Sequence, residues 1–176
     1  LYALQEKDLE IDRLRAEAES LPEELVALQG QVETLEERLT NLLERRAELE
    51  REYNRHSLDI EDLSAKEKQA EEEQKRAQSA REQTQYENRI QQIKDRIREL
   101  LELSTPIMEA MENLEAEIAQ VEEELAALRP RLQELLEANR ARVAELEAAI
   151  AAKVEERTAM AAAIPAQILK EYEAIR

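Results

Sequence analysis

The amino-acid sequence predicts an all-α protein, a long and kinked antiparallel coiled-coil hairpin whose turn lies near residues 79–85. The first observation is composition: the 176 residues include one glycine, four prolines and no cysteine, and the strong helix formers Leu, Ala, Glu, Arg and Gln dominate. The second is that apolar residues recur at alternating steps of three and four in two long runs. The third is the polar stretch that separates the two runs.

The two runs are the strongest periodic signal in the chain. The first extends from Ile11 to Leu63 and the second from Tyr86 to Asn139, and fourteen of the sixteen positions in each are apolar. Heptads sustained over this length, with charged residues between them, are typical of coiled coils. A narrow apolar stripe drifts around a straight helix, so we expect a left-handed supercoil.

The stretch between the runs is the expected site of the turn. Residues 64–85 contain no apolar side chain larger than Ala. Two Ser/Thr-x-x-Glu patterns typical of helix starts lie near its end; they are Ser79–Glu82 and Thr84–Glu87. A fold point near residue 82 also gives two arms of nearly equal length, about 1–80 and about 84–176.

We expect one elongated hairpin domain over residues 1–176, interrupted where Gly, Pro and Ser gather. The predicted breaks lie near 20–22, 57–64, 104–106, 130 and 164–165. Proline inside a helix removes a hydrogen bond and clashes with the preceding turn, so Pro106 should bend or restart its helix, with Thr105 as the cap. Pro22 and Pro165 should separate short terminal helices from the two arms.

The sequence offers no catalytic residue and no cofactor site. One glycine cannot form a glycine-rich phosphate loop, and the many Glu pairs lack the closed pocket that separates carboxyl pKa values. His56 is the only histidine and lacks the Glu-x-x-His partners of a di-iron site, so no metal ligand is assigned. The apolar positions of the two runs are expected to pack together in a contact that we call the seam. We interpret His56, Arg46 and Asn139 as polar residues that set its register.

Charge divides the chain into acidic arms and a nearly neutral tip. The net charge is −17, yet residues 66–100 carry nine basic and eight acidic groups. Acidic arms repel phosphate, which disfavours nucleic acid along them. The candidate partner-binding residues are therefore at the tip: Tyr86, Arg89, Ile90, Ile93, Lys94, Arg96 and Ile97. The simpler interpretation is a thin two-helix seam, in which these isoleucines face Ala70 and Ala77. No apolar run is long enough to predict a membrane span.

Several segments together resemble one protein family. They are Leu1–Leu14, Ser20-Leu21-Pro22-Glu23, Gln83–Asn88, and the end with Ile164-Pro165, Leu169, Tyr172 and Ile175-Arg176. These segments resemble the bacterial helical-hairpin proteins that carry a C-terminal C4-type zinc ribbon. The resemblance implies a cytoplasmic adaptor that binds protein partners or nucleic acid. The ribbon's cysteines are absent here, so zinc is expected only if a ribbon follows Arg176.

These observations predict a non-catalytic interaction or adaptor protein with a protein partner, or one that forms a homodimer. Nucleic acid is expected only through a missing C-terminal module or through the tip. The alternatives are a coiled-coil arm of a larger chromosome-maintenance-type ATPase and a self-associating structural rod. The sequence leaves open which end of the hairpin is the working end.

Overall fold

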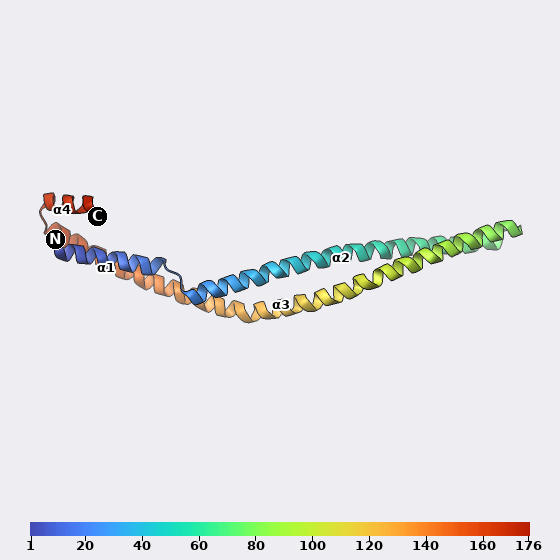
Figure 1. Ribbon diagram of the computed structural model, residues 1–176, viewed down its shortest axis with the longest axis horizontal. Coiled ribbons are helices and arrows are strands. Elements are labelled where there is room, and N and C mark those ends of the chain that lie inside the picture. The colour runs from blue at the N-terminus through green and yellow to red at the C-terminus, as the bar shows by residue number, and fades with distance from the viewer. The chain divides into compact units, whose positions relative to one another are not determined.

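The computed structural model describes all 176 residues, and nearly all of them lie in four helices (Figure 1). The helices are α1 (Tyr2–Glu19), α2 (Glu23–Arg76), α3 (Ala80–Ala162) and α4 (Ala166–Ile175). There is no strand. The predicted fold class, an all-α antiparallel helical hairpin, is confirmed. No helix combines the length and apolar character that crossing a bilayer requires.

Contacts divide the chain into two compact units. The terminal unit comprises Leu1–Glu33 and Ala126–Arg176, and the hairpin unit comprises Thr34–Leu125. Helices α2 and α3 contribute residues to both units, so neither unit coincides with one of the predicted arms. The division of the chain into a single domain with two arms stays a prediction.

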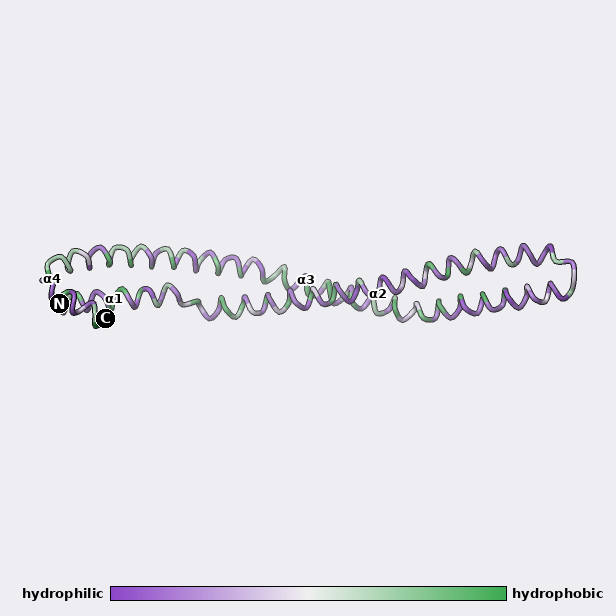
Figure 2. The backbone as a smooth tube through the Cα atoms, turned by 90° about the horizontal axis from the view of Figure 1, so that it is seen from above, coloured by the Kyte–Doolittle hydropathy of each residue, from purple (hydrophilic) through white to green (hydrophobic).

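In the hairpin unit, the chain reverses direction between α2 and α3. The two helices lie side by side up to this reversal, and hydrophilic and hydrophobic residues alternate along both (Figures 1 and 2). Only Ala77–Ser79 lie outside helices there, so the turn begins two residues before the predicted range. The rest of that range, from Ala80, forms the start of α3.

A cap at Ser79 explains this position of the turn. Its Oγ accepts a hydrogen bond from the Glu82 N–H (3.1 Å), and the Glu82 carboxylate accepts one from the Gln78 N–H (3.3 Å). The first bond satisfies a backbone donor that the first turn of a helix leaves free, and the second ties the residue before the cap to that turn. The second predicted cap, Thr84, lies inside α3 instead, where its hydroxyl donates to the Ala80 carbonyl (3.0 Å).

The predicted heptad positions form the seam between α2 and α3. The buried apolar side chains of the hairpin unit all lie at such positions; they are Leu49, Ala70, Ile90, Leu100, Ile107, Ile118, Val121 and Leu125. Ala70 shows that the repeat continues through the polar stretch. Burial of one such Leu or Ile contributes about 1.5–3 kcal/mol, so this seam is the main stabilising feature of a unit without a layered core.

Three of the predicted breaks do not end a helix. Helix α2 continues through 57–64, and α3 continues through 104–106 and 130. At Pro106 the seam explains the difference, because Ser104 and Ile107 on either side of it are both buried. This packing offsets a proline cost of about 3 kcal/mol. Thr105 does not cap a new helix; its hydroxyl donates to the Leu101 carbonyl (3.1 Å).

In the terminal unit, two interruptions separate α1 from α2 and α3 from α4. Ser20–Pro22 and Ala163–Pro165 lie outside the α-helices, near the predicted breaks at 20–22 and 164–165. Arg142 of α3 holds the end of α1 by donating to the carbonyls of Glu17 (2.8 Å) and Ser20 (2.7 Å). The last carbonyl groups of a helix have no hydrogen-bond donor within the helix, and these two bonds provide donors for carbonyls at the end of α1.

Two adjacent leucines give a direct test of the seam. Leu100 is 1% exposed, whereas Leu101 is 52% exposed. We expect Leu100→Ala to lower the free energy of unfolding by about 2–5 kcal/mol, because it leaves a cavity in the seam. Leu101→Ala, the matched control, should lower it by less than about 1 kcal/mol. Urea denaturation followed by circular dichroism measures both, and equal losses would contradict the assigned helix face.

Candidate functional site

The most unusual side chain in the terminal unit is a buried aspartate. Asp8 of α1 is 2% exposed and lies between Leu4 and Ile11, which are also buried. Burying an unpaired carboxylate costs several kcal/mol, so a buried aspartate requires charged or hydrogen-bonding partners.

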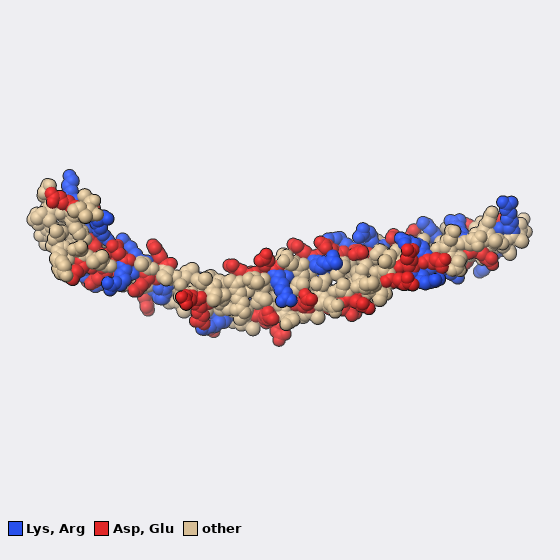
Figure 3. Space-filling model, in the orientation of Figure 1, with Lys and Arg blue, Asp and Glu red and all other residues tan.

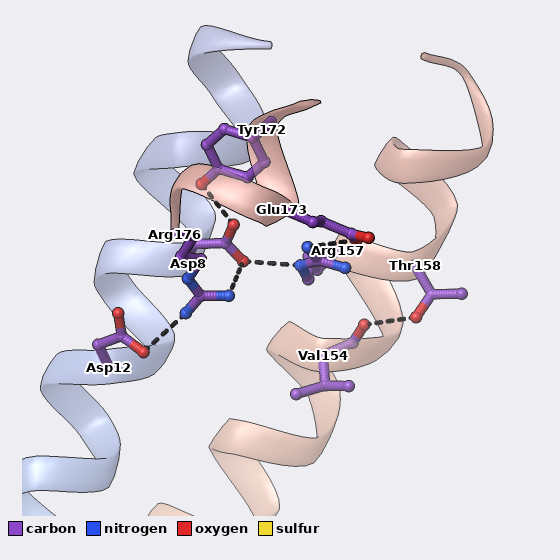
Figure 4. Close-up of polar contacts among 8 residues, drawn as sticks. All are labelled: Asp8, Asp12, Val154, Arg157, Thr158, Tyr172, Glu173 and Arg176. Carbon is purple, nitrogen blue, oxygen red and sulfur yellow. Dashed lines mark hydrogen bonds and ion pairs between the residues drawn. The ribbon is translucent and has the colours of Figure 1, made fainter. Parts of the chain in front are cut away.

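Asp8 has three partners that come from two other parts of the chain (Figure 4). Arg157 of α3 donates from Nε to Oδ1 (2.7 Å), and Tyr172 of α4 donates from its hydroxyl to Oδ2 (2.6 Å). Arg176, directly after α4, places Nη1 at 3.1 Å from Oδ1. We call these four residues the Asp8 clamp. Both carboxylate oxygens are thereby satisfied.

A second set of polar contacts surrounds the clamp. Arg157 donates from Nη2 to Glu173 of α4 (3.1 Å), and Arg176 donates from Nη2 to Asp12 of α1 (2.8 Å). Helix α4 itself has no buried residue. Directional polar bonds therefore contribute much of what holds α4 against α1 and α3.

Electrostatics keep the clamp charged at neutral pH. Burial by itself raises the pKa of Asp8, but the hydrogen bonds from Tyr172 and Arg157, with the charges of Arg157 and Arg176, outweigh it, so the pKa is lowered. Burial and the bond to Asp8 raise the pKa of Tyr172. At neutral pH a carboxylate thus accepts from a neutral phenol and two guanidinium groups. This arrangement fixes geometry and offers no proton acceptor tuned for catalysis near pH 7.

The structure places the apolar members of the predicted tip set in the seam. Ile90 is buried, and Tyr86, Ile93 and Ile97 are half-buried. A partner would therefore find less apolar surface at the tip than an open isoleucine stripe would offer. Partner binding at the tip stays a prediction.

The basic members of the tip set are exposed, and two of them have acidic partners. The side chain of Lys94 lies 3.9 Å from Glu67, and that of Arg96 lies 2.9 Å from Glu99. Arg89 is exposed as well.

The predicted polar seam residues also have partners. Arg46 lies 3.7 Å from Glu115, and Asn139 accepts a hydrogen bond from Arg142 (2.8 Å). His56 is half-buried, with Nε2 4.0 Å from the Glu52 carboxylate. No group of three or more His, Cys, Asp or Glu side chains is arranged to hold a metal ion.

Sequence reasoning missed the Asp8 clamp, although a signal was present. A step of three back from Ile11 and a further step of four place Asp8 and Leu4 on the same stripe. A charged residue on that stripe, next to buried apolar positions, requires a polar partner if the stripe is packed. Only the structure shows that α4 brings Tyr172 and Arg176 to it.

Comparison with known proteins agrees with this architecture. A family model described as the CT398-like coiled coil hairpin domain matches residues 4–176. A structurally characterised protein from Mycobacterium smegmatis is 25% identical and superposes with a TM-score of 0.78, over 98% of this chain and 72% of that chain. No curated protein has significant sequence similarity to this chain.

The lowered pKa of Asp8 predicts how the clamp responds to acid. The contribution of ionised Asp8 to stability should be complete above about pH 4, the ordinary aspartate pKa. It should be lost as pH falls through the lowered pKa of Asp8 in the folded protein. At pH 7 we expect Asp8→Asn to cost about 3–5 kcal/mol, because two arginines lose their carboxylate. Urea unfolding of both proteins between pH 2.5 and 7 should show this difference shrinking below pH 4. Parallel profiles would contradict an ionised Asp8.

Proposed function

The chain belongs to the family of CT398-like coiled coil hairpin domains, and from that premise we propose that it is a non-catalytic interaction scaffold. In this role the paired helices support binding surfaces, and α4 holds a C-terminal module in a fixed direction. The Asp8 clamp is the observation that carries the proposal.

The clamp supports this role because it fixes the orientation of α4, whereas apolar packing at the same place would stabilise the fold at least as well. A ten-residue helix is marginal by itself in water, and replacing a buried ion pair by apolar packing is often neutral or stabilising. Yet α4 is held by bonds from Asp8 to Tyr172 and Arg176, each of which requires a defined orientation. We infer that the direction in which the chain leaves α4 matters for function.

The family resemblance implies a C4-type zinc ribbon, which is the module best suited to a position after α4. The same resemblance implies a cytoplasmic location. The chain's net charge of −17 disfavours phosphate along its helices. Any nucleic-acid contact is therefore assigned to that module or to the tip, and protein partners to the helices. The ATPase-arm and structural-rod alternatives give no reason for a charged cluster that ties α1 to α4, so the clamp favours the scaffold.

A spin-label experiment tests whether the clamp fixes α4. The chain lacks cysteine, so Arg13→Cys in α1 and Lys170→Cys in α4 provide two unique sites. We expect a narrow distribution of distances between the labels, and a markedly broader one after Asp8→Asn, because α4 then loses its main anchor. Glu173→Gln, which leaves all three Asp8 contacts in place, is the matched control and should broaden it little.

Partner capture tests the function itself. We expect the protein expressed from its complete gene to retain at least one protein partner on affinity purification, and Asp8→Asn to reduce that capture at least fivefold while helicity is kept. Equal capture by the Asn variant would show that the position of α4 is irrelevant to binding.

A further inference from the structure

The seam of the hairpin unit has exposed apolar neighbours on both helices. Leu43 in α2 and Leu101 and Met108 in α3 each directly follow a residue of the seam, and they are 42%, 52% and 47% exposed. If the seam residues are the a and d positions of each heptad, all three occupy e positions. An apolar stripe of a, d and e is wider than a two-helix seam needs and is typical of helices that pack against more than one neighbour.

A groove opens on this side of the seam. Its volume is about 220 Å³, and it is lined by Tyr53 of α2 together with Met108, Met111, Glu112 and Glu115 of α3. Tyr53 and Met111 are seam residues, yet both are only half-buried. The groove therefore exposes part of the seam between two helices. Methionine adapts to differently shaped apolar partners, which suits a binding surface.

The charges at the groove distinguish between occupants. Glu115 is paired with Arg46 (3.7 Å), whereas Glu112 is exposed and has no ion pair in the structure. Acidic and basic side chains alternate along the face drawn in Figure 3, but acidic groups exceed basic ones over the chain as a whole, whose net charge is −17. A second copy of the chain would bring like charges to this groove, while a basic partner would find opposite charges.

We propose that this groove, extended along α3 by Leu101 at the next e position, docks an amphipathic helix of a partner protein whose apolar stripe is flanked by Lys or Arg. One large apolar side chain of that helix enters between Tyr53, Met108 and Met111. Its basic residues face Glu112. This mode is helix-in-groove recognition. The inference rests on the proposed interaction function but is independent of the Asp8 clamp.

The test uses a defined probe with the full chain. The probe is a fluorescein-labelled 18-residue peptide with Leu at helical i, i+3, i+4, i+7 spacing and Lys on the flanks; a second peptide carries Glu in place of Lys. Fluorescence anisotropy should show binding of the Lys peptide, and at least tenfold weaker binding of the Glu peptide. Met108→Gln and Leu101→Gln together should weaken the Lys peptide at least tenfold, and Glu112→Gln about threefold.

Leu58→Gln is the matched control, because Leu58 is apolar and 64% exposed but lies outside the groove. It should change affinity less than twofold, and circular dichroism should give the same helicity for all variants. Equal binding by the groove variants, or equal binding of both peptides, would overturn the proposal. A dimer in sedimentation velocity that Met108→Gln converts to monomer would instead identify a second copy as the occupant. Partner capture that depends on Asp8 would leave the proposed function standing even if the groove fails.

Discussion

The burial of one narrow apolar stripe between antiparallel helices is the constraint on which the structure depends. The hairpin unit has no sheet and no layered core, so its seam residues must find their partners across the pair of helices. Leu100, Val121 and Leu125 are almost completely buried only because the chain reverses at Ala77–Ser79. Surface ion pairs between the helices, such as Arg38 with Glu117 (3.9 Å), are exposed and contribute little energy.

The same constraint explains why polar residues on the stripe matter. The Ser104 hydroxyl satisfies itself locally by donating to the Leu100 carbonyl (2.8 Å). Asp8 cannot do so, and its carboxylate instead recruits Arg157, Tyr172 and Arg176. A buried charge that needs three specific partners tolerates few alternative arrangements of α4. An interaction scaffold benefits from a fixed α4, because less conformational entropy is then lost when a partner binds.

Much of the fold was predictable because heptad periodicity depends only on local spacing. The runs from Ile11 and Tyr86 identified the seam, and Ser79–Glu82 marked the start of α3. The breaks expected at 57–64, 104–106 and 130 do not end a helix, because packing around Ser104 and Ile107 outweighs the local preference of Pro106, and a bend at these places stays a prediction. The Asp8 clamp and the groove at Met108 could not be predicted in detail, since both depend on side chains from separate helices whose register the sequence fixes only approximately.

One distance measurement tests the antiparallel seam most directly. Arg38→Cys and Glu117→Cys place two spin labels at exposed positions of a chain that has no other cysteine. Packed helix axes lie about 10 Å apart, so we expect a label separation within about 30 Å that persists when labelled protein is diluted with unlabelled protein. One continuous helical rod would separate the same positions by on the order of 120 Å. A long distance, or a short one that disappears on dilution, would contradict the hairpin.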